Sequence, residues 1–410
     1  MKILYITPYI TSKSHPAFMR NQTGFGYMVH DIAENVGVFE NVDVFSLMTF
    51  TPSMELDGFH VIGHSWLKWL RNIRWQNIKD CLYFIRKYPQ TWKNLLRTLY
   101  IFTAIGQVEK ILNRYDVVHI HGCSSITDAS IVACQRQRVK FLVTLHGLNS
   151  FEKSIILSNV MKQYEKNFLV EAAKKEWFMS FISTGNKNTA ENYVKSVYNK
   201  DISCNFHVIN NGCNINVQPQ IEDIRKIYHI DNDQFVFVFV GNISENKNQI
   251  QVVRSWMLLS DEDKKKCRVL FVGNYKKSDD IVNYIQHYHL QSELILCGMQ
   301  PKNRISQFYQ VANATVLTSL SEGFGLSIIE GMAYGLPCLT FADLPAIADL
   351  YDERAMVTIK TRSDQDVATS IHTMMSRAWN KVWIKEYAKR FSFESMAKKY
   401  DELYKEIKEG

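Results

Sequence analysis

The chain has 410 residues, of which 46% are hydrophobic and 22% charged, so it is long enough to bury the cores of two globular domains. Its formal net charge of +7 is mild and diffuse, which favours anionic ligands or a membrane surface over nucleic acid. The eight cysteines are scattered without a Cys-x-x-Cys pair, and no stretch reaches the about eighteen apolar residues that span a membrane. We therefore expect a cytoplasmic protein with reduced thiols.

Short apolar runs recur along the chain with helical segments between them, which is typical of buried parallel strands. The runs cover residues 3–7, 42–47, 116–121, 141–146, 177–183 and 206–210, and then 235–240, 268–272, 294–297, 314–318, 338–341 and 356–359. This pattern predicts two doubly wound α/β domains, over residues 1–215 and 216–384. In such sheets ligands bind beyond the carboxyl ends of the strands, so the residues that follow each run are the candidates for a site.

Two predicted strands of the first half end in His-Gly, at His121 and at His146. A single histidine in this position is usually structural, but two at adjacent strand ends favour a cleft position for at least one. The connection over residues 8–22 is long enough for a binding loop, and it leads to Gly24 and Gly26 at the start of a helix. These glycines do not complete a dinucleotide fingerprint, because position 29 is Val29.

The segment 66–100 combines tryptophans and basic residues with helical spacing of its apolar positions. It contains Trp66, Trp69, Trp75 and Trp92, with Lys68, Arg71, Arg74, Lys79, Arg86, Lys87, Lys93 and Arg97 against a single acid, Asp80. Two interpretations stay open. The segment is either a pair of amphipathic helices packed on the sheet, or a helical surface that lies in a membrane interface with its basic residues on anionic lipid.

In the second half, two strand ends carry the residue types that bind phosphate and sugar. The run 235–240 leads into Gly241-Asn242-Ile243-Ser244-Glu245-Asn246-Lys247, which places a lysine just beyond a strand. The run 314–318 leads into a glycine turn and a helix, bracketed by Glu322 and Glu330. A helix start attracts phosphate and carboxylates accept hydrogen bonds from hydroxyls, so a sugar joined to phosphate would satisfy both features.

Two other interpretations of the glutamate pair are open. In a glycoside hydrolase the two carboxylates lie about 5 to 9.5 Å apart, whereas eight helical residues would separate them by roughly 12 Å, although the turn could shorten this. The plainer alternative is a strand-to-helix turn with two solvated glutamates, and only the glycines between them argue against it.

The stretch from Glu322 to Pro337 reads Glu322-Gly-Phe-Gly-Leu-Ser-Ile-Ile-Glu330-Gly-Met-Ala-Tyr-Gly335-Leu-Pro337, and weaker elements precede it in order at 116–122, 144–147, 210–212 and 241–247. Together these motifs resemble the retaining glycosyltransferases of family 4 (glycosyltransferase group 1). The resemblance implies the GT-B fold, in which two Rossmann-like domains face a central cleft. It also implies that the helix over residues 385–410 crosses back to the N-terminal domain.

The resemblance further implies roles for residues at matching positions. Lys247 would neutralise the leaving diphosphate, Glu330 would hold the nucleotide ribose, and His146 would lie near the donor sugar. The remaining donor contacts would come from Glu322, from the backbone of Gly323, Phe324, Gly325 and Leu326, from Met299 near the base, and from Gly24 and Gly26 on the N-terminal side. Asn242 stands where the family usually has an arginine, and Arg20, Arg304 and Arg354 are the candidates to replace it.

By this resemblance we expect a metal-independent enzyme without a cofactor that moves a sugar from a UDP- or GDP-sugar to a glycan or lipid-linked glycan. Such a reaction would belong to bacterial surface polysaccharide or glycoconjugate synthesis, with the protein peripheral on the cytoplasmic membrane face. Two alternatives stay open: a GT-B sugar-nucleotide epimerase or phosphorylase, and a non-catalytic subunit that binds a sugar nucleotide.

Overall fold

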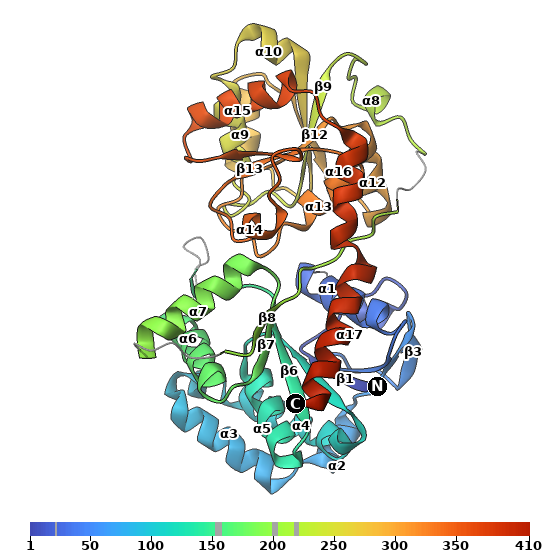
Figure 1. The fold of residues 1–410 in the computed structure, drawn as a ribbon, viewed down its shortest axis with the longest axis vertical. Helices are drawn as coiled ribbons and strands as arrows, with labels where there is room; N and C mark the ends of the chain where they lie inside the picture. The colour runs from blue at the N-terminus through green and yellow to red at the C-terminus, as the bar shows by residue number, and fades with distance from the viewer. Residues whose placement is uncertain (21–22, 152–157, 199–203, 217–220) are drawn as a thin grey trace. The chain divides into compact units, whose positions relative to one another are not determined.

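The computed structural model describes residues 1–20, 23–151, 158–198, 204–216 and 221–410, and it divides into two compact units (Figure 1). The N-terminal unit contains most of residues 1–211 together with 393–410, and the C-terminal unit contains residues 212–392. The changes of unit thus fall at 211/212 and 392/393, whereas the sequence placed them at 215/216 and 384/385. Both units are built on parallel sheets, as the spacing of the apolar runs predicts.

In the described part of the N-terminal unit, eight strands form one sheet in the order β3-β4-β2-β1-β5-β6-β7-β8. The strands are β1 (Lys2–Thr7), β2 (Asn41–Ser46), β3 (Met54–Leu56), β4 (Phe59–Val61), β5 (Val117–His121), β6 (Lys140–Leu145), β7 (Phe178–Phe181) and β8 (Phe206–Val208). Neighbours pair in parallel, except that β3 and β4 form an antiparallel hairpin at the edge. The carboxyl ends of the parallel strands therefore meet at one edge of the sheet.

Helices cover this sheet because their apolar faces match its buried strands. They are α1 (Gly24–Val36), α2 (Trp66–Asn72), α3 (Trp75–Lys87), α4 (Leu95–Glu109), α5 (Ser125–Gln137), α6 (Asn159–Lys174), α7 (Thr184–Tyr198) and α17 (Phe393–Glu409), with the short 3-10 turns η1 (Pro16–Phe18), η2 (Pro89–Asn94) and η3 (Leu112–Arg114). Helix α17 packs against α1, β5 and β6, although it is the last element of the chain. Its buried residues Met396, Ala397, Tyr400, Leu403, Tyr404 and Ile407 form one apolar face.

The described C-terminal unit contains six parallel strands in the order β11-β10-β9-β12-β13-β14. They are β9 (Phe235–Val240), β10 (Cys267–Val272), β11 (Leu294–Gly298), β12 (Ala314–Leu317), β13 (Cys338–Phe341) and β14 (Met356–Ile359). From β9 the chain proceeds outward to β10 and β11, and then returns to β12 on the other side of β9. This reversal of strand order creates a switch point between the ends of β9 and β12, where doubly wound sheets bind their ligands.

The helices of the C-terminal unit are α8 (Ile224–Ile227), α9 (Gln249–Trp256), α10 (Asp261–Lys266), α11 (Asp280–His287), α12 (Lys302–Val311), α13 (Leu326–Ala333), α14 (Ile347–Leu350), α15 (Asp364–Ser376) and α16 (Lys381–Ala388), followed by the turn η4 (Lys389–Phe391). The sequence predicted one helix over 385–410, but the structure forms two. Helix α16 contacts α13 of its own unit, and Ser392 adopts an extended conformation (ψ 157°) before α17 begins in the other unit.

Candidate active site

The loops after β9 and β12 meet at the switch point of the C-terminal unit and are joined by several hydrogen bonds. The Leu320 amide donates to the Asn246 carbonyl at 2.7 Å, and the Asn246 side-chain amide donates to the Ser321 carbonyl at 3.1 Å. The Thr318 hydroxyl donates to the Asn248 carbonyl at 3.0 Å. These bonds hold the two loops in a fixed mutual position, so the side chains that they carry form one site.

Lys247 and Glu322 are in direct contact at this site. The Lys247 ammonium donates to Glu322 Oε1 at 2.5 Å, and the Ser319 hydroxyl donates to the same oxygen at 2.7 Å. The side chains of Lys247 and Glu322 are 27% and 12% exposed, so a ligand can reach both. The structure therefore brings together the lysine and the glutamate that the sequence singled out, and it adds Ser319 as a third member.

The glycine turn after Glu322 leads into α13. Gly325 has φ 78°, a left-handed conformation that favours glycine, and it is the N-cap residue of α13. The Ile328 amide donates to the Gly325 carbonyl at 2.9 Å. Because glycine has no side chain to cap the helix, the amides before Ile328 are left to water or a ligand, and their partial positive charge favours an anion. The Phe324 side chain is 3% exposed and packs near Phe391, so only the backbone at this position can serve a ligand.

Glu330 lies in α13 and has a tyrosine partner that sequence reasoning missed. The Tyr309 hydroxyl donates to Glu330 Oε2 at 2.9 Å, and the Tyr309 ring stacks on Tyr334 with 5.6 Å between centroids. Burial raises the pKa of Tyr309 well above its usual value, so this hydroxyl stays a donor at neutral pH. A carboxylate fixed in this way can accept hydrogen bonds from a diol such as a ribose.

Asn242 lies just beyond the end of β9 and Met299 just beyond the end of β11, two strands that are separated by β10. Asn242 Oδ1 accepts a hydrogen bond from the Asn274 amide at 2.9 Å and carries no charge. Met299 directly follows β11 and is 69% exposed, so its side chain is accessible at the edge of the sheet. Asn242 therefore cannot supply the positive charge of the arginine that usually stands at its position in the resembled family.

Two of the three predicted replacements for that arginine are paired with carboxylates. Arg304 pairs with Glu222 at 2.7 Å, and Arg354 pairs with Asp352 at 2.7 Å, while Arg20 belongs to the N-terminal unit. Arg362, which follows β14, donates to the Ser319 carbonyl at 3.0 Å and pairs with Asp343 at 2.7 Å. It is a cation against the loop that carries Glu322, and no motif in the sequence marked it.

In the N-terminal unit, His146 at the end of β6 contacts the start of α1. The Phe25 ring packs edge-on against the His146 ring, with 5.0 Å between centroids. Phe25 lies between Gly24 and Gly26, and a Cβ atom at Gly26 would come within 2.1 Å of Thr11 Oγ1. A larger residue at Gly26 would therefore push the preceding loop away, whereas a Cβ at Gly24 would meet nothing within 4 Å.

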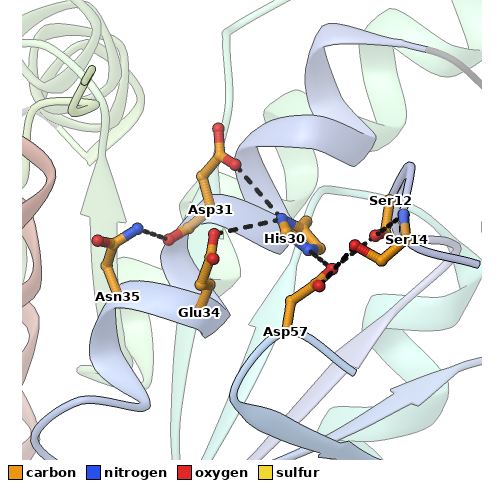
Figure 2. Close-up of polar contacts among 7 residues, drawn as sticks. All are labelled: Ser12, Ser14, His30, Asp31, Glu34, Asn35 and Asp57. Atoms are coloured by element: carbon orange, nitrogen blue, oxygen red, sulfur yellow. Dashed lines mark hydrogen bonds and ion pairs between the residues drawn. The ribbon is translucent and has the colours of Figure 1, made fainter. Parts of the chain in front are cut away.

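The loop that precedes α1 is tied to a cluster of charged side chains, which Figure 2 shows. Asp57, in the β3–β4 turn, accepts hydrogen bonds from the hydroxyls of Ser12 and Ser14, each at 2.6 Å, and lies 2.8 Å from His30 Nε2. Residues 12 and 14 belong to the predicted binding loop, so this cluster fixes the loop to the sheet edge.

The second ring nitrogen of His30, Nδ1, lies near two carboxylates of its own helix. His30 Nδ1 lies 3.3 Å from Asp31 and 3.9 Å from Glu34 (Figure 2). Burial opposes the charged form, but hydrogen bonds to Asp31 and Asp57 outweigh it and raise the pKa of His30. Among the described residues, His30, Asp31 and Glu34 place three potential metal-ligand atoms within 4.8 Å of one another.

Comparisons with known proteins agree with this architecture. Residues 220–391 match the family model described as "Glycosyl transferases group 1". The chain is 23% identical to N-acetyl-alpha-D-glucosaminyl L-malate synthase of Bacillus anthracis over 228 residues, which are 55% of this chain and only 56% of that protein. It is 21% identical to the O-antigen biosynthesis glycosyltransferase WclY of Escherichia coli over 324 residues, which are 74% of this chain and 82% of that protein.

Among solved structures, the chain resembles Anabaena HepE in complex with UDP and glucose. The TM-score is 0.66 at 16% identity, and the alignment covers 99% of this chain and 100% of that one. At this identity the likeness concerns the fold. It confirms the prediction of two Rossmann-like α/β domains of the GT-B type.

Proposed function

We propose that this protein transfers a hexose from a nucleotide-sugar donor to a glycan or lipid-linked glycan acceptor, because residues 220–391 match the family model of the group 1 glycosyl transferases. The observation that carries the proposal is the contact between Lys247 and Glu322 beside the start of α13. An ammonium beside helix-end amides at a switch point supports a diphosphate site there.

In this reaction the bond between the sugar C1 and the diphosphate oxygen breaks while the acceptor hydroxyl oxygen bonds to C1. Lys247 and the first-turn amides of α13 stabilise the negative charge that develops on the leaving oxygen, which then takes the acceptor proton. Glu330, oriented by Tyr309, holds the nucleotide ribose. With positive charge supplied in this way, transfer needs neither a metal ion nor a protein nucleophile, and the anomeric configuration is retained by attack from the leaving-group side.

The comparisons also favour particular substrates. HepE was solved with UDP and glucose, which supports a UDP-sugar as donor, with a GDP-sugar as the alternative. The name of WclY refers to O-antigen biosynthesis, which supports a surface polysaccharide or its lipid-linked precursor as acceptor. His146, which contacts Phe25 beside Gly24, is proposed to face the donor sugar.

The experiment combines donor binding with product analysis. The purified chain is screened by thermal shift against UDP-, GDP- and ADP-sugars, and the stabilising donor is then incubated with lipid-linked and free glycans. We expect transfer of the sugar, and we expect NMR of the product to show the same anomeric configuration as in the donor. Epimerised donor without acceptor, sugar phosphate on addition of inorganic phosphate, or donor binding without any turnover would instead support one of the alternatives.

We also propose that the protein lies peripherally on the cytoplasmic membrane face. Nothing in the described helices has the length and apolar character needed to traverse a bilayer. The inner side of α3 is packed, with Cys81, Phe84 and Ile85 buried, but large apolar side chains also face outward on α2 and α3. Leu67 is 70% exposed and Trp75 is 67% exposed, among the basic residues of the segment 66–100. Exposed tryptophan and leucine beside basic residues suit a surface of anionic lipid.

A further inference from the structure

A buried chain of polar groups connects the C-terminal helix to the sheet of the N-terminal unit. The Tyr404 hydroxyl on α17 lies 2.7 Å from the Tyr5 hydroxyl and 2.7 Å from His119 Nδ1. His119 Nε2 lies 2.6 Å from the Thr144 hydroxyl. These four side chains are fully buried, and both nitrogens of His119 have a partner, so the His119 ring is held in a single orientation.

His121 is the next inward-facing residue of β5 and links this chain to His146. Its ring lies against the His119 ring, with 4.0 Å between centroids, and against the Tyr5 ring at 5.1 Å. His121 Nδ1 is 3.1 Å from His146 Nε2. Its other nitrogen, Nε2, is buried and has no hydrogen-bond partner among the described residues.

The contact between His121 and His146 fixes which nitrogen of each ring carries a proton. Burial lowers the pKa of His121 well below its usual value and that of His146 to about 4, so both rings are neutral at neutral pH. If His146 donated, His121 would carry its proton on Nε2 and bury an N–H group without a partner, which is rare in native structures. If His121 donates from Nδ1, only a lone pair is left unpaired at Nε2. The second arrangement leaves the proton of His146 on Nδ1.

We propose that Tyr404, His119 and His121 are positioning residues that hold His146 with its proton on Nδ1, so that His146 offers an N–H donor to an oxygen of the donor sugar. This inference rests on the proposed function, in which His146 faces that sugar. It assigns the C-terminal helix a part in transfer, because α17 carries the hydroxyl that orients His119. It also makes His146 a hydrogen-bond donor and not a general base, because its Nδ1 carries the proton and the lone pair of its Nε2 accepts from His121.

The test compares two substitutions at His121. His121→Leu removes the donor to His146, whereas His121→Asn keeps an amide N–H near the position of Nδ1. In the leucine variant we expect kcat to fall about tenfold, the loss of roughly one hydrogen bond, with donor KM changed less than twofold. The pKa of His146, followed by 15N NMR, should rise in this variant, because Nε2 becomes free to accept a proton. The asparagine variant should restore both.

A spectroscopic measurement tests the proton position independently of transfer. In protein labelled with 15N-histidine, with the His146 signals assigned by loss in His146→Gln, the wild type should show a protonated Nδ1 and a bare Nε2. Tyr404→Phe, checked for folding by circular dichroism, should broaden or mix these two signals. A bare Nδ1 in the wild type would overturn the inference even if transfer occurs. If no donor is turned over, the proposed function fails, and the 15N signals still decide the proton position.

Discussion

Lys247 Nζ lies 2.5 Å from Glu322 Oε1, so the ammonium of the candidate site already has a carboxylate partner. The two residues come from loops 75 positions apart, and the contact forms because β9 and β12 are neighbours in the sheet. A nucleotide diphosphate carries more negative charge than one carboxylate and would compete with Glu322 for the ammonium. The ion pair therefore keeps Lys247 in place and can be exchanged for the diphosphate contact.

The first prediction concerns this lysine. Lys247→Ala should lower kcat/KM at least about 100-fold, because it removes a cation that stabilises charge in the transition state. Lys247→Arg keeps the charge and should retain more activity than the alanine variant. The melting temperature of both should stay close to that of the wild type, since the side chain is partly exposed. Full turnover by a folded alanine variant would contradict the proposed mechanism.

Tyr309 offers a test of the ribose contact. Tyr309→Phe removes the hydrogen bond to Glu330 but keeps the ring, so donor KM should rise about five- to tenfold, with kcat within about twofold. Tyr334→Phe is the matched control, because it removes a hydroxyl from the ring stacked on Tyr309 and leaves the Glu330 contact intact. Equal effects of the two substitutions on donor KM would show that the hydrogen bond does not orient Glu330.

The core of the fold follows from the sequence because parallel strands are buried on both faces and appear as continuous apolar runs. The run 235–240 is an example, and it forms β9. The edge hairpin β3–β4 was not predicted, because its strands have only three residues each. Asp57-Gly58 is nevertheless a hairpin turn signal, with φ values of 46° and 88°. The unit boundary at 392/393 was not predicted for another reason. Both α16 and α17 have charged residues and an apolar side in sequence, and only tertiary packing assigns them to different units.

A residue of the candidate site was predictable where the sequence pattern that marks it lies within one loop. Lys247 and Glu322 each follow an apolar run with glycines nearby, and strand ends in such sheets converge. The contributions of Tyr309 and Arg362 depend on contacts between distant segments, and tyrosine or arginine in a helix or loop has no distinctive local pattern. The same holds for Tyr404, whose hydrogen bond to His119 spans 285 positions.

Membrane contact is testable with vesicles of defined charge. The protein should co-float with vesicles that contain phosphatidylglycerol and not with pure phosphatidylcholine, and raised salt should release it. The double substitution Leu67→Ser and Trp75→Ser should weaken binding several-fold. Val382→Ser on α16, which is 79% exposed outside this segment, is the control and should bind like the wild type. Equal binding to neutral vesicles would argue against the role of the basic residues.

Chelation tests the proposed independence of metal. If Lys247 and the α13 amides supply the stabilising positive charge, EDTA should leave the transfer rate within about twofold of the untreated rate. Magnesium and manganese should not raise it further. A loss of activity that added metal restores would point to a bound cation, and the variant Glu34→Gln would then show whether the group formed with His30 and Asp31 holds it.

Protonation of His30 should contribute to the pH dependence of the free energy of unfolding. Its pKa is raised in the folded protein, so its contribution to stability is complete below the unfolded value near 6.5 and is lost as pH rises through the folded value. The pKa of Asp57 is lowered by Ser12, Ser14 and His30, so its contribution is present above the unfolded value near 4 and is lost on acidification.

Urea unfolding at pH 6 and pH 8 measures the histidine contribution. The wild type should exceed His30→Gln in unfolding free energy by roughly 1.5–3 kcal/mol at pH 6, the range for a hydrogen bond to a charged group, and by less at pH 8. Glutamine can still donate to Asp57 but does not titrate, so the pH dependence of the difference isolates the imidazolium. A difference that grows between pH 6 and pH 8 would mean that neutral His30 is the stabilising form, and that its hydrogen bonds to Asp31 and Asp57 do not favour the proton.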